Sequence, residues 1–278
     1  METLYKLSGA GNDFIVLDGR SGGVDEYRKE VTIRTLCDRS TGFKAADGRV
    51  GADGVMILSS SVDGAWDFVM EYFNSDGSSG MMCGNGGRCI VAFADFLGIV
   101  PANGKFYEFL AADGPHTGEI LGRDGHSCTV KLKMKDVSEY RRCTDGWFLD
   151  TGTRHFVKFV DDVEAVDIAT EGPRYRWSEE FAPIGANVNF VQVLPDGSLK
   201  VRTFEKGVED ETLACGTGIT ASALAAQLEA WHKDTNSDTT AKSIHTAVHA
   251  RIDELAVDFT PSGSIFTDVF LTGPAALI

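Results

Sequence analysis

The feature that most constrains this chain is a short motif that occurs twice, as C-G-N-G at residues 83–86 and as C-G-T-G at residues 215–218. Each copy follows an apolar run, which ends at Phe73 in the first case and at Phe204 in the second. Each copy also precedes small and apolar residues at helical spacing. We interpret the repeat as an internal duplication that gives two similar α+β domains facing each other across a cleft, the alternative being a chance match.

Apolar runs between turn residues predict the remaining elements. In the first half we expect strands near residues 5–7, 14–17, 55–58 and 67–73, with a glycine-bounded loop at 8–13. A helix should begin near Cys83 and end before Gly98, and a second helix should run from Cys215 to about Ala230. An exposed loop is expected at 233–243, and the second half should contain strands near 130–134, 156–160, 188–194, 199–204, 255–259 and 266–271.

Cys83 and Cys215 are candidates for acid–base chemistry because each is expected at a helix N-terminus. Unpaired backbone N–H groups and the helix dipole favour a thiolate there, and the same groups can hold a carboxylate. One thiolate could therefore remove a proton next to a carboxylate, while the other thiol delivers a proton to the opposite face of the carbon. The alternative for any single cysteine is a small buried hydrophobe, which we assign to Cys37, Cys89, Cys128 and Cys143.

Charge and composition exclude several other classes of protein. The formal net charge of −15 argues against a nucleic-acid partner. The N-terminus resembles no secretory signal, and no apolar run has the roughly 18 residues of a membrane span, so the expected location is the cytoplasm with reduced thiols. No C-x-x-C pair occurs, and His245 and His249 lack companion cysteines, so we expect no metal site.

Several polar residues stand near the predicted strand ends, and each also has a structural explanation. Asn12, Asn74 and Asn187 could serve as turn or cap residues. Glu205 and Lys206 could be a solvated charge pair, and His155 could be a core or surface histidine.

Taken together, the motifs resemble those of the diaminopimelate epimerases. The resembling segments are K-L-S-G-A-G-N-D-F at 6–14, G-A-D-G at 51–54, F-N-S-D-G at 73–77, M-C-G-N-G-G-R-C at 82–89, E-T-L-A-C-G-T-G at 211–218 and F-T-D-V-F-L-T-G-P-A at 266–275. They are spread over the whole chain, and the two cysteine segments are the most specific.

The resemblance implies an enzyme without a cofactor that interconverts LL- and meso-diaminopimelate in lysine and cell-wall precursor synthesis. It implies two pseudo-symmetric α+β domains, each a mostly antiparallel sheet wrapped around a central helix, at 1–122 with 265–278 and at 123–264. A homodimer is also implied.

The resemblance assigns roles to individual residues as well. Cys83 and Cys215 would be the acid–base pair. The reacting end of the substrate would bind at Asn12, Gly84, Asn85, Gly216 and Thr217, and its amino group near His155 and Glu205. The distal end would bind at Asn74, Asn187 and Lys206.

This chain departs from the family pattern at three places. Lys206 stands where arginine is common, which keeps the charge but loses the bidentate fork. Thr153 and Arg154 replace an asparagine and a proline before His155, and residues 44–49 resemble an insertion. The alternatives left open are an enzyme similar to proline racemase or hydroxyproline epimerase, and a non-catalytic amino-acid-binding protein of the same fold.

Overall fold

A computed structural model describes residues 2–80, 82–233 and 242–278. The chain divides into two compact units, Met1–Leu132 with Gly273–Ile278 (unit 1) and Lys133–Thr272 (unit 2). The boundaries expected at 122 and 265 fall within one strand, β6 (Gly114–Asp124), and at the first residue of another, β16 (Ile265–Leu277). Because β16 is long, its first part belongs to unit 2 and its last part to unit 1.

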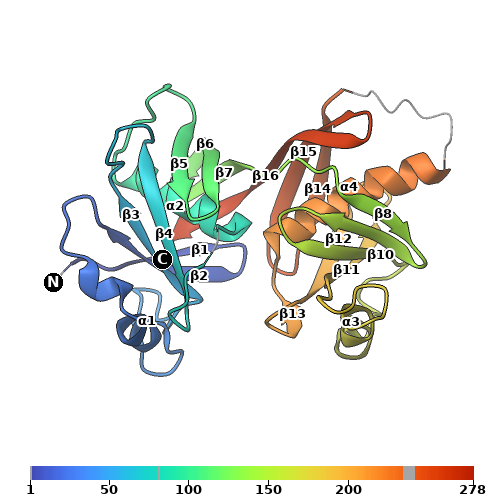
Figure 1. The fold of residues 1–278 in the computed structure, drawn as a ribbon, viewed down its shortest axis with the longest axis horizontal. Coiled ribbons are helices and arrows are strands. Elements are labelled where there is room, and N and C mark those ends of the chain that lie inside the picture. Colours follow the sequence, from blue (N-terminus) through green and yellow to red (C-terminus); the bar gives the residue numbers. More distant parts are fainter. Residues whose placement is uncertain (1, 81, 234–241) are drawn as a thin grey trace. The chain divides into compact units, whose positions relative to one another are not determined.

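Unit 1 is a strand layer closed around one helix, α2 (Gly84–Phe96) (Figure 1). Hydrogen bonds connect the strands in the order β1-β2-β3-β4-β5-β6-β7-β16, and β16 also pairs with β1. The strands other than β6 and β16 are β1 (Tyr5–Gly9), β2 (Asn12–Asp18), β3 (Gly54–Ser59), β4 (Phe68–Asn74), β5 (Tyr107–Ala111) and β7 (Ser127–Lys133). Every residue of α2 from Gly84 to Ala94 is buried, as expected for a helix inside a closed sheet.

The middle residues of strands β2 and β3, 14–17 and 55–58, are all apolar and buried because both faces of these strands are covered. They run parallel. Met56 points toward α2, whereas Ile15 and Ile57 pack outward against α1 (Glu30–Cys37), which follows a 3₁₀ turn, η1 (Asp25–Arg28). A parallel pair buried on both faces loses the alternation of a half-exposed strand.

Unit 2 repeats this plan around α4 (Gly216–Lys233). Its strand order is β8-β9-β10-β11-β12-β14-β15-β16, with the short β13 paired to β12. The elements are β8 (Tyr140–Cys143), β9 (Gly146–Asp150), β10 (Arg154–Phe159), α3 (Ile168–Arg176), β11 (Asn187–Val193), β12 (Leu199–Glu205), β13 (Asp210–Thr212), β14 (Ile244–His249) and β15 (Glu254–Ser262). Helix α3 packs against β11, β12 and β13, over a core that includes Phe156, Phe190 and Phe204.

The strand pairings show the internal repeat directly. In unit 1 the successive pairs from β1 to β6 are antiparallel, parallel, antiparallel, parallel and antiparallel. The pairs that link β9, β10, β11, β12, β14 and β15 in unit 2 follow the same series. In both units the central helix follows the fourth strand of the series. The predicted α+β fold with two pseudo-symmetric halves is confirmed.

Some local expectations need correction. Residues 8–13 are not a loop: β1 and β2 form a hairpin in which Ser8 pairs with Asp13 and Gly9 pairs with Asn12. The turn is only Ala10 and Gly11, both with positive φ. Helix α4 continues to Lys233, and most of the loop expected at 233–243 lies outside the described residues.

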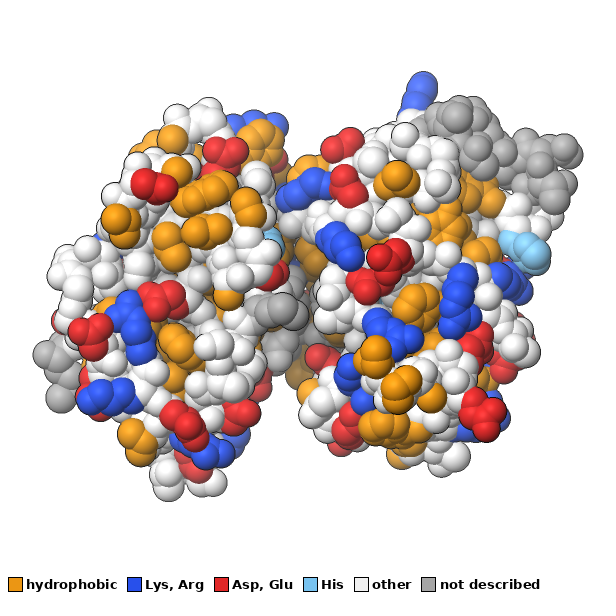
Figure 2. All heavy atoms as spheres, in the orientation of Figure 1, with side chains coloured by type: hydrophobic (Ala, Val, Ile, Leu, Met, Phe, Trp, Pro, Cys, Tyr) orange, Lys and Arg blue, Asp and Glu red, His pale blue; other side chains and the backbone are white. Residues whose placement is uncertain are grey.

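Charged side chains of both signs are interspersed on the visible face of each unit (Figure 2). Many charged side chains of the described residues form ion pairs, such as Arg28 with Glu71 at 2.6 Å. Among the described residues, no helix combines the length and the apolar character needed to cross a membrane.

Candidate functional site

Cys83 caps the N-terminus of α2. Its backbone is extended, with φ −112° and ψ 155°, and its Sγ accepts a hydrogen bond from the Gly86 N–H at 3.2 Å. The side chain is half-buried. The first N–H groups of a helix have no intrahelical partner, so a sulfur in this position is surrounded by donors that stabilise its anion.

Asn12 and Asn85 meet beside this helix start in a chain of hydrogen bonds. Arg88 Nη2 donates to Asn85 Oδ1 at 2.9 Å, and Asn85 Nδ2 donates to Asn12 Oδ1 at 2.6 Å. Asn12 Nδ2 in turn donates to Asp53 Oδ2 at 2.9 Å. Because a guanidinium only donates and a carboxylate only accepts, the two ends of the chain fix the orientation of both amides.

Arg88 is a component that the sequence analysis missed. It is fully buried and also donates to the carbonyls of Gly84, at 3.1 Å, and of Pro274, at 3.3 Å. It therefore joins the start of α2 to the end of β16. The signal in the sequence is that Arg88 is the one basic residue among the small and apolar residues that begin α2. A charge buried at such a position requires partners.

Asp53 connects the chain of hydrogen bonds through Asn85 and Asn12 to the end of β4. It forms an ion pair with Arg39 at 2.5 Å, and its carbonyl accepts from the Ser75 N–H at 3.0 Å. Asn74 is the last residue of β4, and its Nδ2 donates to Ser78 Oγ at 3.0 Å. Asn74 thus lies in a turn that is tied to Asp53 through the backbone.

Cys215 precedes the first residue of α4, as Cys83 precedes that of α2. Its carbonyl accepts the Ile219 N–H at 2.8 Å, and its Sγ lies 3.4 Å from Thr217 Oγ1. The thiol is half-buried. Gly216 and Thr217 therefore contribute N–H groups to a second helix start that can hold an anion.

His155 lies behind Cys215 and is fully buried. Burial lowers its pKa from 6.5 to about 3, and the nearby Asp150 carboxylate only partly opposes this effect. His155 Nε2 lies 2.9 Å from both Thr217 Oγ1 and Thr153 Oγ1. The ring is therefore neutral and reaches the helix start through two threonine hydroxyls.

The remaining predicted residues lie together at the start of β11 and the end of β12, which are adjacent because the two strands are antiparallel. Asn187 Nδ2 donates to the Arg154 carbonyl at 3.0 Å, and its Oδ1 accepts the Lys206 N–H at 2.8 Å. Lys206 is exposed, and Glu205 is half-buried at the end of β12. Glu205 thus has the same place in unit 2 that Asn74 has in unit 1.

The other cysteines fit a structural role. Cys37, Cys89 and Cys143 are buried, which raises the pKa of each thiol to about 12, whereas Cys128 is only half-buried. His245 pairs with Asp258 at 2.7 Å. Within the described part of the chain, no cluster of three His, Cys, Asp or Glu side chains could hold a metal ion.

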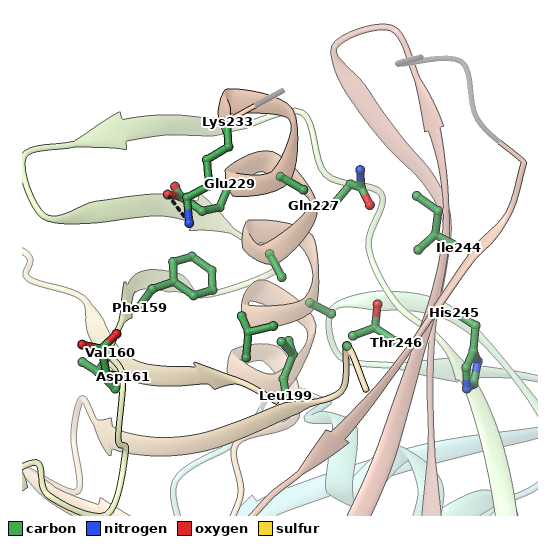
Figure 3. Close-up of a pocket in the computed structure, with 15 residues that line it drawn as sticks. Phe159, Val160, Asp161, Leu199, Gln227, Glu229, Lys233, Ile244, His245 and Thr246 are labelled. Carbon is green, nitrogen blue, oxygen red and sulfur yellow. Dashed lines mark ion pairs between the residues drawn. The ribbon is translucent and has the colours of Figure 1, made fainter. Parts of the chain in front are cut away.

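Unit 2 also contains a pocket of about 690 Å³ beside the C-terminal half of α4 (Figure 3). Glu229 and Lys233 project from the helix at its rim and form an ion pair at 3.5 Å. The α4 residues that line the pocket begin at Ala223, which is seven positions after Gly216 and so about 10 Å along the helix. This pocket is therefore distinct from the start of α4 that carries Cys215.

Comparison with known proteins decides the family. The family model described as diaminopimelate epimerase matches residues 4–111 and 147–262, more than half of the chain. A diaminopimelate epimerase from Flavobacterium psychrophilum is 40% identical over 277 residues, covering 99% of this chain and 97% of the relative. This chain belongs to the diaminopimelate epimerase family.

A further member of the diaminopimelate epimerase family and two solved structures are also similar to this chain. The enzyme from Aquifex aeolicus is 39% identical, covering 97% of this chain and 93% of its own. A Bacillus anthracis protein of the PhzF family has a TM-score of 0.67 at 11% identity, covering 99% of this chain and 96% of its own. A hydroxyproline epimerase from Agrobacterium vitis has a TM-score of 0.60 at 16% identity, covering 99% and 88%. The solved structures establish the fold alone.

Proposed function

We propose that this member of the family interconverts LL- and meso-2,6-diaminopimelate by inverting one α-carbon, without a cofactor, in the synthesis of lysine and peptidoglycan precursors. The observation that carries the proposal is that Cys83 and Cys215 each immediately precede the first residue of a central helix. Two relatives that are about 40% identical over nearly the whole chain are both named diaminopimelate epimerase, which supports diaminopimelate as the substrate.

The backbone N–H groups at the two helix starts bind the α-carboxylate of the substrate, through Gly84 and Asn85 on one side and Gly216 and Thr217 on the other. Asn12, whose amide orientation is fixed by Asn85 and Asp53, contacts the reacting end. Glu205 lies near the reacting amino group. His155 acts on the same end through the Thr217 hydroxyl.

The distal end of diaminopimelate carries an amino group and a carboxylate, which require both acceptors and donors. Asn74 and Asn187 provide amide groups for this end, and the exposed ammonium of Lys206 provides a positive charge for the carboxylate.

The thiolate of one cysteine removes the α-proton and becomes a thiol, and the electron pair left on carbon delocalises into the carboxylate. The thiol of the other cysteine then delivers its proton to the opposite face of the carbon and becomes a thiolate. Proton exchange with water restores the starting pair, and the reverse reaction exchanges the two roles.

The resemblance to the family also supports a cytoplasmic homodimer, which belongs to the same proposal. Sedimentation of the purified protein would test the oligomeric state.

An exchange assay in heavy water tests the substrate. The enzyme is incubated separately with LL-diaminopimelate and with proline, and deuterium at the α-carbon is measured by NMR. We expect labelled meso- and LL-diaminopimelate and unlabelled proline. Deuterium in proline only would reject the proposal and favour the proline-racemase-like alternative.

A further inference from the structure

Hydrogen bonds connect His155, next to Thr217 at the start of α4, to two further buried polar side chains, Asn189 and Thr203. Asn189, on β11, has a fully buried amide, and Thr203, on β12, is 2% exposed. Asn189 and His155 lie against the start of α4, because a Cβ placed on Gly218 would be 2.4 Å from Asn189 Oδ1 and 3.2 Å from His155 Cε1. Thr203 pairs with Asn189 across β11 and β12. Neither residue has a role in the proposed function so far.

The orientation of the Asn189 amide is fixed by two of its neighbours. Asn189 Nδ2 donates to the Phe156 carbonyl at 3.2 Å, and a carbonyl can only accept. Asn189 Oδ1 accepts the hydroxyl of Thr203 at 2.9 Å. The nitrogen of this amide therefore also faces His155 Nδ1, at 3.0 Å.

This contact determines where His155 carries its proton. A ring nitrogen that faces an N–H donor must accept, so Nδ1 is unprotonated. The ring is buried and neutral, which leaves the single proton on Nε2. His155 in this state cannot take a proton from a thiol, because its basic nitrogen is already occupied by Asn189.

The Nε2–H group instead faces two hydroxyls. Thr217 Oγ1 and Thr153 Oγ1 each lie 2.9 Å from Nε2 and 3.0 Å from one another. A thiolate at Cys215 can only accept, and Thr217 Oγ1, 3.4 Å from Sγ, is placed to donate its hydroxyl proton to the sulfur. The Thr217 oxygen is then free to accept from His155.

We propose that Thr203, Asn189, His155 and Thr217 form a one-way chain of hydrogen-bond donors that stabilises the Cys215 thiolate. In this chain Asn189 and His155 are positioning residues, and His155 acts as a donor, never as a base toward Cys215. The proposal deepens the proposed function, since it rests on Cys215 acting as a base. Its structural content can be measured without any substrate.

The first test is the tautomer of His155 in the unmodified protein. Nitrogen-15 NMR of histidine-labelled enzyme reports which ring nitrogen carries hydrogen, and the His155 signals are assigned by their loss in His155→Gln. We expect a neutral ring with hydrogen on Nε2 from pH 6 to pH 8. Hydrogen on Nδ1, or a charged ring at pH 6, would overturn the proposal.

The second test measures the thiolate directly. Iodoacetamide alkylation of Cys215 is followed against pH by peptide mass spectrometry, which separates it from the other cysteines. Thr217→Val should raise the pH midpoint by about 1–2 units, the shift expected when one hydrogen bond to a charged group is lost. Thr220→Val is the matched control, because the Thr220 hydroxyl donates to the Gly216 carbonyl within α4.

Asn189→Asp reverses the chain, since a carboxylate accepts from Nδ1–H and leaves Nε2 as an acceptor. We expect it to raise the same midpoint, with the tautomer changed in the NMR spectrum. An unchanged midpoint in Thr217→Val would refute the donor chain. If the tautomer and the alkylation midpoints are as expected but the exchange assay gives no label in diaminopimelate, the proposed function is rejected and the donor chain is not.

Discussion

The starts of the two central helices share a backbone plan but differ in their surroundings. Cys83 stands beside a charged chain that runs from the buried guanidinium of Arg88 to the carboxylate of Asp53. Cys215 stands beside uncharged threonine, histidine and asparagine side chains. The duplication therefore preserved the position of the thiol while its electrostatic setting diverged, and the two cysteines are expected to differ in reactivity.

The glycines that end the two motifs show the same divergence. A Cβ on Gly86 would lie 3.3 Å from Cys83 Sγ and 3.6 Å from Met56 Sδ. A Cβ on Gly218 would lie 2.4 Å from Asn189 Oδ1. The first glycine faces sulfur atoms that can move aside, whereas the second faces a fixed buried amide.

The largest effect should follow removal of either thiol. Cys83→Ala and Cys215→Ala each delete one of the two acid–base groups, so epimerisation should fall by about 10²- to 10⁴-fold or more. Circular dichroism should remain that of the folded protein. Full turnover by either variant would show that the two helix starts do not share the chemistry.

The next largest effect should be a loss of stability when the hydrogen-bonded chain from Arg88 to Asp53 in unit 1 is broken. Arg88→Met removes the side-chain donor that Asn85 Oδ1 and the carbonyls of Gly84 and Pro274 share, and it replaces a fully buried side chain. Each hydrogen bond from a charged group contributes roughly 1.5–3 kcal/mol. We expect the free energy of unfolding in urea to fall by about 3 kcal/mol or more.

Arg123→Met is the control for Arg88→Met. Arg123 pairs with Asp95 at 2.5 Å, but its side chain is 60% exposed, so its loss should cost less than about 1 kcal/mol. Equal effects of the two substitutions would mean that Arg88 is not an essential part of the packing.

The two glycines allow a matched test of the divergence. Gly218→Ala forces the start of α4 away from Asn189 and should lower the free energy of unfolding by about 1–3 kcal/mol. Gly86→Ala should change it by less than about 1 kcal/mol, since alanine also favours the helix. Thermal unfolding of both variants would measure the difference, and a larger loss for Gly86→Ala would reverse our comparison.

The smallest effect is a pH dependence specific to unit 2. The pKa of His155 is about 3 in the folded protein and about 6.5 when unfolded, so only the unfolded chain binds this proton between those values. Acidification therefore destabilises the fold below pH 6.5, by about 1.4 kcal/mol between pH 7.5 and 5.5. His155→Gln should lose this part of the pH dependence in urea unfolding, and an unaltered dependence would contradict the buried neutral ring.

Much of the fold could be predicted because its strongest signals are local. The periodicity after Cys83 and Cys215 indicated α2 and α4, and the internal repeat indicated the two-part plan. By contrast, α1 and α3 were missed. Helix α3 contains Gly172 and Pro173, which weaken its local helical signal, and it forms because its apolar side packs on Phe204 and its neighbours.

Motifs in the sequence indicated the candidate site residues, whereas buried polar neighbours that are placed only by packing were missed. Asn12 and Asn85 lie far apart in sequence and meet because the β1–β2 hairpin passes the start of α2. Asn189 lies in an apolar strand, and Arg88 lies within a helix. Each is recognisable only as a polar residue at a buried position, which sequence alone indicates weakly because it does not reveal the partners.

The central claim is that Cys83 and Cys215 act on opposite faces of the same α-carbon. Solvent-deuterium exchange by Cys83→Ala and Cys215→Ala, each supplied separately with LL- and meso-diaminopimelate, tests it most directly. We predict that each variant exchanges the α-proton of one configuration only, and that the two variants have opposite preferences. Exchange of both configurations by a single variant, or the same preference in both, would contradict the account.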